Sequence, residues 1–228
     1  MSNVAVIPAR GGSKRIPRKN IRDFLGKPII AYSIEIALES GLFDEVMVST
    51  DDADIARVAE KYGAVVPFFR SDEASDDYAT LADVIEDVKS QYQGKERSFD
   101  YICCILATAP LLKMEHLLKG YKLITKGDAD SFRPVVQFPY PIQRAVRLIN
   151  NRVEMFNKEL ARTRSQDLEP AYYDAGQFYW MKYHMGLKGP VKGGFEISAQ
   201  FVQDIDDEED WKIAELKYRL LKKIDNGE

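Results

Sequence analysis

The sequence contains little cysteine and little histidine, two of each among 228 residues. Adjacent residues on a strand point to opposite faces, so the neighbouring Cys103 and Cys104 make a poor structural bridge, and a disulfide scaffold is excluded. Two thiols and two imidazoles also fall short of a zinc cage. We therefore assign both cysteines and His116 to packing or surface positions, and this cysteine usage fits a reducing compartment.

Long hydrophobic runs and a large excess of one charge are also missing. No window approaches the length of a membrane span, and residues 1–7 lack a basic stretch followed by a long apolar one. Lysine and arginine total 32 and aspartate and glutamate total 36, which gives a net charge of −4. Such mild acidity argues against wholesale binding to nucleic acid or to anionic membranes. We expect a soluble cytoplasmic protein.

The apolar residues that are present form the alternating pattern of an α/β domain. Hydrophobic residues make up 45% of the chain, enough for a core at this length. Strands are expected at 4–7, 46–48, 64–69 and 101–106, and helices at about 28–40, 52–62, 78–91, 114–125 and 211–224. The helix at 211–224 carries an apolar stripe of Ile213, Leu216, Leu220 and Ile224. This order predicts a mostly parallel, twisted sheet with helices on both faces.

The pattern changes near residue 130. Residues 131–156 read as short strands with turns around Asn150 and Asn151, and a polar, basic stretch follows at 157–167. There is no internal repeat and no Gly/Ser-rich linker. We therefore expect a single domain over 1–228 that carries a small inserted hairpin region at about 131–165.

A basic, glycine-containing loop follows the first predicted strand. It places five cations beside a Gly-Gly pair: Arg10, Lys14, Arg15, Arg18 and Lys19. In an open parallel sheet, ligands bind outside the carboxyl ends of the strands, where this loop would lie. Glycines let backbone N–H groups approach an anion, and basic side chains neutralise it. A solvated basic loop is the simpler alternative, but the position of the loop favours a nucleoside triphosphate.

Several segments resemble the acylneuraminate cytidylyltransferases, enzymes that form CMP-activated nonulosonic acids from CTP. They are IPARGGSK at 7–14, KN at 19–20, GKP at 26–28 and VSTDD at 48–52. The resemblance extends to the C-terminal helix and implies a Rossmann-like nucleotidyltransferase fold. It implies that Arg10 and Lys19 hold the triphosphate and that Asn20 contacts the cytidine. The full set of CTP-binding positions that it implies is Ala9, Arg10, Gly11, Gly12, Ser13, Lys19, Asn20, Arg70 and Thr80. For Thr80, a role as the first-turn residue of the following helix remains an equal alternative.

The sugar side of the resemblance is less regular. It points to Leu106, Thr108, Arg164, Gln166, Tyr173, Gln177 and Tyr179. Leu106 stands where the sialic acid enzymes have a glutamine, and Ala175 where they have an asparagine. Losing two amides among aromatic side chains suits a sugar with fewer hydroxyls and more methyl groups, such as pseudaminic acid. The product would serve surface glycan or flagellin glycosylation, and N-acetylneuraminic acid is the alternative substrate.

The segment from Phe201 to Asp206 reads as strand-like, so the carboxylates of Asp204 and Asp206 would share one face. Mg²⁺ takes one or two carboxylates together with substrate phosphates, and the resembling family uses this D-x-D for its metal. The alternative is an acidic start to the last helix. We expect Arg10, Lys19, Asp204 and Asp206 to be catalytic and the insertion to form a homodimer interface, as its counterpart does in that family. A non-catalytic nucleotide-binding module and a D-x-D glycosyltransferase remain the rival functions.

Overall fold

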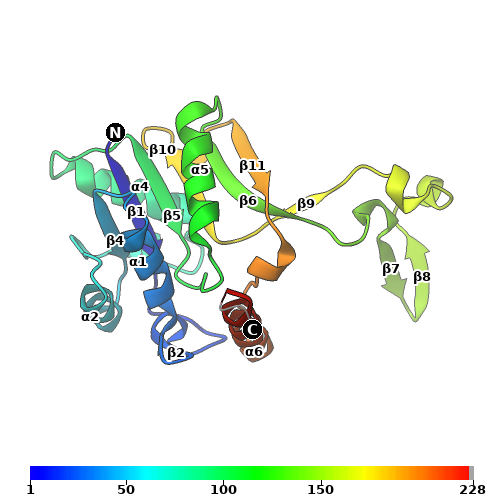
Figure 1. Cartoon of the computed structure of the whole chain (residues 1–228), viewed down its shortest axis with the longest axis horizontal. Helices are drawn as coiled ribbons and strands as arrows, with labels where there is room; N and C mark the ends of the chain where they lie inside the picture. The colour runs from blue at the N-terminus through cyan, green and yellow to red at the C-terminus, as the bar shows by residue number, and fades with distance from the viewer. Residues whose placement is uncertain (226–228) are drawn as a thin grey trace.

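The computed structural model describes residues 1–225, which are built around one seven-stranded sheet (Figure 1). Its strand order is β11-β6-β10-β5-β1-β4, and β9 pairs with β6 beside this path. The strands are β1 (Asn3–Pro8), β4 (Glu45–Ser49), β5 (Tyr101–Ile105), β6 (Ser131–Gln137), β9 (Tyr172–Asp174), β10 (Phe178–Lys182) and β11 (Lys192–Glu196). β1 lies inside the sheet with its first five residues buried, as its unbroken apolar sequence predicts.

The predicted mostly parallel sheet is confirmed, although the sheet is mixed. β1 is parallel to both β4 and β5. β10 is antiparallel to both β5 and β6, so β6 runs in the same direction as β5, and β11 is parallel to β6. Five strands therefore share one direction, and β9 and β10 oppose it. The carboxyl ends of β1, β4 and β5 consequently meet at one edge of the sheet.

Helices cover both faces of the sheet, as predicted. α1 (Ile29–Glu39), α2 (Ala53–Lys61) and α5 (Met114–Lys126) pack on one face through the cluster that contains Ile34, Ile55 and Leu117. α4 (Leu81–Gln93) packs on the other face through Ile85 and Val88. Figure 1 shows α5 and α1 in front of the strands and α4 behind them.

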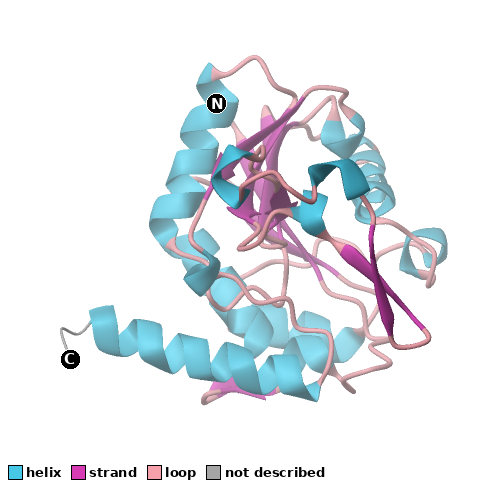
Figure 2. Cartoon of the chain, turned by 90° about the vertical axis from the view of Figure 1, so that its right-hand side faces the viewer, coloured by secondary structure: helices cyan, strands magenta, loops and turns pink. Residues whose placement is uncertain are grey.

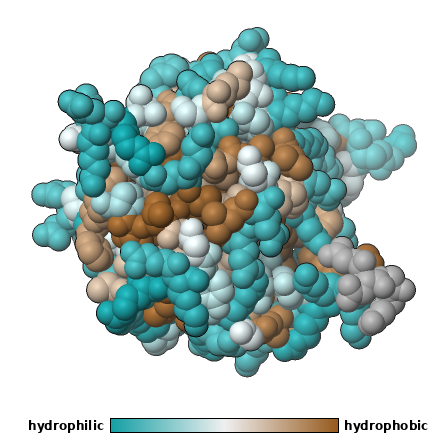
Figure 3. Space-filling model, turned by 60° about the vertical axis from the view of Figure 1, so that its left-hand side comes forward, coloured by the Kyte–Doolittle hydropathy of each residue, from teal (hydrophilic) through white to brown (hydrophobic). Residues whose placement is uncertain are grey.

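The strand predicted at 64–69 is wrong. Val65 alone bridges to Met47 beside the edge strand β4, with its N–H donating to Val46 O and its carbonyl accepting from Val48 N. Pro67 has no N–H, so the pairing cannot continue. In Figure 3 the face turned forward from this side of the molecule is largely hydrophilic and is crossed by one apolar band.

The last helix, α6 (Glu208–Asp225), buries a different stripe from the one seen in the sequence. Trp211 and Ala214 pack against Phe24 in a third apolar cluster, whereas Leu216 and Leu220 of the expected stripe are exposed. Asp207 begins the helix, because its carboxylate accepts from the Glu209 and Asp210 N–H groups. Figure 2 shows α6 as a long helix running past the end of the sheet layers.

An arm leaves the sheet between β6 and β9. It spans residues 138–171 and contains the hairpin of β7 (Val146–Ile149) and β8 (Arg152–Met155), which pair with each other and not with the central sheet. Figure 1 shows it projecting on the right. Of the segment predicted as an insertion, residues 131–137 are strand β6 of the central sheet, so the projecting part starts later and ends later.

The remaining elements are short. They are β2 (Asp23–Phe24), β3 (Lys27–Pro28), α3 (Asp72–Ser75) and the 3-10 turns Lys19–Ile21, Ile142–Arg144, Lys158–Leu160, Ser165–Asp167, Gly186–Lys188 and Ala199–Phe201. Within residues 1–225 there is no helix with the length and apolar character needed to span a bilayer.

Candidate active site

The loops that follow β1 and β4 are tied together at the carboxyl edge of the sheet. Ala9 N donates to Ser49 O at 2.9 Å, and Gly11 N donates to Asp51 Oδ1 at 2.9 Å. A Cβ on Gly11 would lie 2.6 Å from Asp52 Oδ2, so this approach of the two loops requires glycine. Asp52 is in turn fixed as the N-cap of α2. The basic loop therefore has a defined course at the edge where α/β proteins bind ligands.

A pocket of about 240 Å³ lies beside this loop. It is lined by Pro8, Arg10, Ser13, Lys19, Asn20, Arg70, Ala79, Leu81 and Val84. Five of the residues predicted to bind CTP thus converge on one cavity between the basic loop and the start of α4. Three of them are cations, and the rest of the wall is largely apolar. This composition suits a ligand with an anionic end and a flat, less polar end.

Arg10 and Lys14 share a carboxylate that the sequence did not single out. Arg10 Nη1 lies 3.2 Å from Asp77 Oδ1, and Lys14 Nζ bonds to the other oxygen of the same carboxylate. Asn20 Nδ2 donates to Arg10 O at 3.0 Å, so it holds the backbone of the loop. Asp77 therefore places an anionic group between two cations of the loop, a contact that an arriving phosphate would replace.

Arg70 is buried, and its guanidinium donates hydrogen bonds to Ser49 at the end of β4. Its Nε donates to Ser49 Oγ at 3.0 Å, and its Nη2 donates to Ser49 O. Burial lowers the pKa of Arg70, and the nearby Asp51 carboxylate opposes this effect. An arginine remains protonated under such conditions, so Arg70 supplies a fixed positive charge to the floor of the pocket.

Thr80 is a helix cap in this structure. Its hydroxyl accepts from Asp83 N at 3.3 Å, while Asp83 Oδ2 accepts from Thr80 N at 3.0 Å, which completes a capping box. Its side chain is absent from the wall of the pocket, although Ala79 and Leu81 belong to it. The structure thus shows Thr80 in its role at the start of the helix, and its contact with CTP stays a prediction.

Lys19 connects the basic loop to the acidic segment before α6. Its Nζ donates to Ile205 O at 2.7 Å. Burial lowers the pKa of Lys19, and the charge of Asp206, followed more weakly by that of Asp204, raises it again. Arg15 Nη2 also lies 2.6 Å from Asp206 Oδ1. The two predicted clusters, separated by almost the whole chain, therefore meet at one place.

The strand predicted at 201–206 is wrong, and burial along it does not alternate, because the buried residues Val202 and Ile205 are three positions apart. Phe201 closes a 3-10 turn with Ser198, and Asp206 N donates to Asp210 Oδ2 at 3.0 Å. The N–H groups at both ends of the segment are thus used by the turn and by the helix start, and residues 202–206 belong to no strand. Ile205 is buried under α6, while Asp204 is exposed and Asp206 partly exposed.

The two carboxylates suit Mg²⁺ by the chemistry of their donor atoms. Mg²⁺ prefers oxygen ligands and commonly takes one or two carboxylates together with substrate phosphates. Asp204 and Asp206 offer such oxygens next to Lys19 and Arg10, where phosphates would bind. Asp206 would give up its ion pair with Arg15 to serve as a ligand. The site thus fits a metal that is held jointly by the protein and its substrate.

Some of the predicted sugar-binding residues lie near the acidic segment or the CTP pocket. Leu106 N donates to Gln177 O at 2.8 Å, and Gln177 Nε2 donates to Phe201 O at 2.6 Å, just before the acidic segment. Thr108 is partly exposed in the loop after β5. Tyr179 lies on the α4 face of the sheet, in the apolar cluster that includes Leu81 of the pocket wall.

The other predicted sugar-binding residues lie in the arm or at its base. Arg164 and Gln166 are exposed at its 3-10 turn 165–167, where Arg164 Nε lies 3.8 Å from Asp167 Oδ2. Tyr173 packs on Phe138 at the base of the arm, with ring centroids 5.0 Å apart. Figure 1 shows the arm pointing away from the carboxyl ends of β1 and β4. Within one chain, Arg164 and Gln166 are therefore not brought to the pocket.

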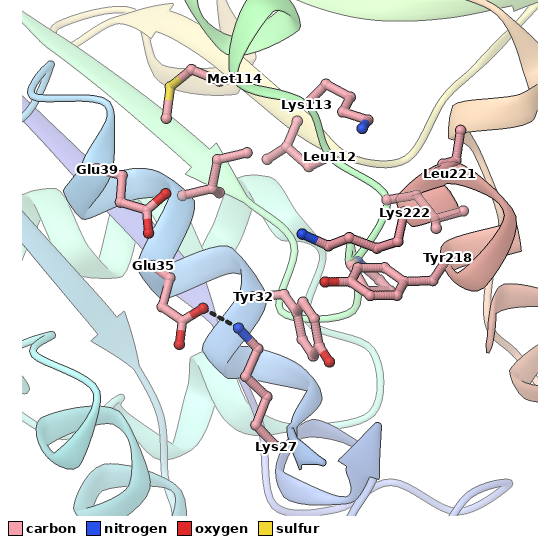
Figure 4. A pocket seen from close by; sticks show the side chains of 13 residues that line it. Lys27, Tyr32, Glu35, Glu39, Leu112, Lys113, Met114, Tyr218, Leu221 and Lys222 are labelled. Carbon is pink, nitrogen blue, oxygen red and sulfur yellow. Dashed lines mark hydrogen bonds and ion pairs between the residues drawn. The ribbon is translucent and has the colours of Figure 1, made fainter. Parts of the chain in front are cut away.

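A second pocket, of about 370 Å³, lies between α1, the loop before α5, and α6 (Figure 4). Lys27 pairs with Glu35 in it and also lies 4.1 Å from the centre of the Tyr32 ring. None of the residues predicted to bind CTP, sugar or metal lines it. In this pocket Lys27 is paired with Glu35, whereas the pocket beside Arg10 brings three cations to one cavity.

Cys103 and Cys104 are fully buried in β5, and burial raises the pKa of the Cys104 thiol to about 12. A thiol in this state is a poor nucleophile. His116 is buried against the ring of Phe201, with centroids 5.1 Å apart, and burial lowers the pKa of its imidazole. The assignment of the two cysteines and His116 to packing is confirmed.

Comparison with known proteins adds a family to this geometry. The sequence pattern of the family described as "Cytidylyltransferase" matches residues 4–208. The chain is 45% identical over 227 residues to pseudaminic acid cytidylyltransferase of Campylobacter jejuni, covering 96% of this chain and 97% of that protein. It is 37% identical to N-acylneuraminate cytidylyltransferase A of Danio rerio, covering 92% and 49%. The solved structure of CMP:2-keto-3-deoxy-manno-octonic acid synthetase with CTP matches with a TM-score of 0.69, covering 98% and 100%; at 15% identity it shows a common fold.

Proposed function

The chain belongs to the cytidylyltransferase family, and we propose that it transfers CMP from CTP to the anomeric hydroxyl of pseudaminic acid and releases pyrophosphate. The observation that carries the reaction is the meeting of Arg10, Lys19 and Arg70 with the carboxylates of Asp204 and Asp206. Support for the sugar comes from the 45% identity to the Campylobacter jejuni enzyme. N-acetylneuraminic acid, the alternative substrate, is supported by the more distant Danio rerio relative.

The residues of the chain contribute mainly by position and charge, as is usual in phosphoryl transfer. The guanidinium of Arg10 exchanges its ion pair with Asp77 for hydrogen bonds to phosphate oxygens. Lys19 neutralises the negative charge that develops as pyrophosphate leaves. Arg70, which is held by Ser49 in the wall of the same pocket, adds a fixed positive charge. Asp204 and Asp206 would hold Mg²⁺, which polarises the phosphate oxygens when bound. One of these two carboxylates would accept the proton of the sugar hydroxyl.

Competition between the two sugar acids for limiting CTP tests the proposal. We expect CMP-pseudaminic acid to be the main product, with only weak formation of CMP-N-acetylneuraminate. An apolar pocket rejects an added hydroxyl by only about a hundredfold, so some product from the second sugar is compatible with this assignment. Preferential formation of CMP-N-acetylneuraminate would overturn the choice of sugar. Failure to release pyrophosphate from CTP with any sugar acid would overturn the reaction itself.

The buried environment of Lys19 predicts how the activity depends on pH. Burial lowers its pKa below the ordinary lysine value of 10.5, so Lys19 loses its proton at a lower pH than an exposed lysine does. We expect kcat/KM for CTP, which reports the free enzyme, to fall on the alkaline side as this proton is lost. Arginine keeps its charge above pH 12, so Lys19→Arg should shift that fall to higher pH. An unchanged alkaline limb in Lys19→Arg would remove Lys19 from this role.

We propose that the arm forms a homodimer interface. One face of its hairpin carries Val146, Leu148, Val153 and Met155, which are neighbours across the two strands. Leu148 is 72% exposed and Val153 65% exposed. Apolar side chains in such a contiguous, exposed arrangement are typical of association surfaces. The opposite face carries charged residues such as Arg147 and Glu154, which suits contact with water.

Replacing both Leu148 and Val153 by serine should therefore convert the protein to a monomer. Both side chains are largely exposed in the single chain, so the fold should persist. Light scattering measures the mass of the particle, and circular dichroism checks the fold. Glu154→Gln, on the other face of the same hairpin, is the matched control and should leave the mass unchanged. Retention of a dimer after the double substitution, or after deletion of residues 138–156, would contradict this proposal.

A further inference from the structure

A charged, partly exposed cluster lies on the α4 face of the sheet, where β6, β9 and β10 are neighbours. It consists of Arg133 on β6, Asp174 on β9 and Tyr179 on β10. Arg133 Nη1 donates to Asp174 Oδ2 at 2.8 Å, and the guanidinium carbon lies 5.0 Å from the centre of the Tyr179 ring. An arginine so fixed is preorganised, because both an ion pair and an aromatic face limit its motion.

This cluster adjoins the CTP pocket along the sheet. Tyr179 is opposite Cys104, and Cys104 is opposite Val6, two residues before Pro8 of the pocket wall. Tyr179 also belongs to the apolar cluster that contains Leu81, another wall residue. β6 is three strand positions from β1, which at the usual spacing is about 14 Å. A sugar acid that reacts at the pocket would extend over this part of the face.

The guanidinium of Arg133 is oriented toward the edge of the sheet at which the basic loop lies. In the sheet register Asp174 is opposite Val135, which lies two residues nearer the carboxyl end of β6 than Arg133 does. Its ion pair therefore pulls the Arg133 side chain toward the edge at which the basic loop lies. The Arg133 side chain is 27% exposed and that of Asp174 36% exposed, so both remain open to a ligand.

A guanidinium has five N–H donors on two edges and can bridge two carboxylates, one from the protein and one from a ligand. Burial and the neighbouring Asp174 raise the pKa of Tyr179, so its hydroxyl stays protonated as a possible donor. The proposed substrate carries one carboxylate next to its anomeric carbon. In the proposed reaction the cations that line the pocket would bind the triphosphate, so the sugar carboxylate needs a cation of its own.

We propose that Arg133 binds the carboxylate of the sugar acid and that Asp174 is a positioning residue for it. This inference rests on the proposed function and adds the anion-recognition part of the sugar site. It also gives a role to Tyr179 as the aromatic platform under the guanidinium. The fork of an arginine matches a carboxylate in a way that a lysine does not, so Arg133→Lys is an informative variant beside Arg133→Ala.

The test compares the affinity for the sugar acid with the affinity for CTP. Arg133→Ala should raise KM for the sugar acid by about tenfold to a hundredfold, the range for a hydrogen bond to a charged group, and change KM for CTP less than twofold. Arg133→Lys and Asp174→Asn should show smaller rises in the same direction. Arg97 is a matched control, because it pairs with Glu45 at 2.6 Å and lies 5.4 Å from the Tyr92 ring centre. Arg97→Ala should leave both KM values unchanged.

A sugar acid whose carboxylate is blocked separates carboxylate binding from a merely structural effect of the substitution. The methyl ester of the sugar acid, measured as a competitive inhibitor, should bind the wild type about tenfold or more weakly than the free acid, but bind Arg133→Ala about equally. An equal penalty for the ester in both proteins, or a change in KM for CTP alone, overturns this inference while CMP transfer continues. Absence of transfer to any sugar acid by the wild type overturns the proposed function, and the inference with it.

Discussion

Asp206→Asn and Asp204→Asn should each lower turnover on the order of a thousandfold, because each removes charge from a site that stabilises phosphate by several kcal/mol. Neither side chain is part of the apolar core, and the buried Ile205 between them continues to fix the segment under α6. We therefore expect both variants to fold. The measurement is pyrophosphate release at increasing Mg²⁺ concentration, with thermal unfolding as a check.

Asp207 provides the control, since it belongs to the same acidic run but has a different function. Its carboxylate caps α6 through the N–H groups of Glu209 and Asp210. Asp207→Ala should lower the free energy of unfolding by about 1 kcal/mol and leave turnover within a few-fold of the wild type. Near-normal turnover of both the Asp204 and Asp206 variants at saturating Mg²⁺ would contradict the metal assignment and leave the helix start as the role of the whole run.

Arg10→Ala should lower kcat/KM for CTP on the order of a hundredfold. One guanidinium that makes two charged hydrogen bonds to phosphate contributes about 3 kcal/mol, which corresponds to that factor. KM for the sugar acid should change little, because Arg10 lines the cavity between the basic loop and α4, whereas Arg133, the proposed partner of the sugar carboxylate, is on β6. Steady-state kinetics with each substrate varied in turn measures the two effects separately.

Because Arg10 contacts Asp77, the variant Asp77→Ala distinguishes a direct role of Arg10 in CTP binding from an indirect one. If Arg10 acted only by holding Asp77, Asp77→Ala would reproduce the loss seen in Arg10→Ala. We expect the reverse, with CTP affinity retained or improved, because Asp77→Ala frees both Arg10 and Lys14. Lys14→Ala should have a small effect, since the Lys14 side chain is 75% exposed. A collapse of sugar binding in Arg10→Ala with CTP binding intact would assign the loop to the wrong substrate.

Elements that depend on nearby residues could be read from the sequence. The apolar run of β1 identified a buried strand, the basic loop after it lies at the carboxyl edge of the sheet as predicted, and a helix begins after Asp52 where one was expected. Motif order assigned the triphosphate residues Arg10 and Lys19, and both line the same pocket. These features are determined locally, because burial on both faces and helix capping leave a periodic or positional signal in the chain.

Features that depend on long-range pairing were decided only by the tertiary structure. The insertion of β10 between β5 and β6, the face that α6 buries and the meeting of Arg133 with Asp174 leave no periodic signal. The sequence predicts a strand at 201–206, yet the N–H groups of Phe201 and Val202 close a turn, and that of Asp206 bonds to the start of α6. Sequence periodicity tells how a segment can bury its apolar side, but the partner that covers it, and hence which charges meet, is set by the packing of distant elements.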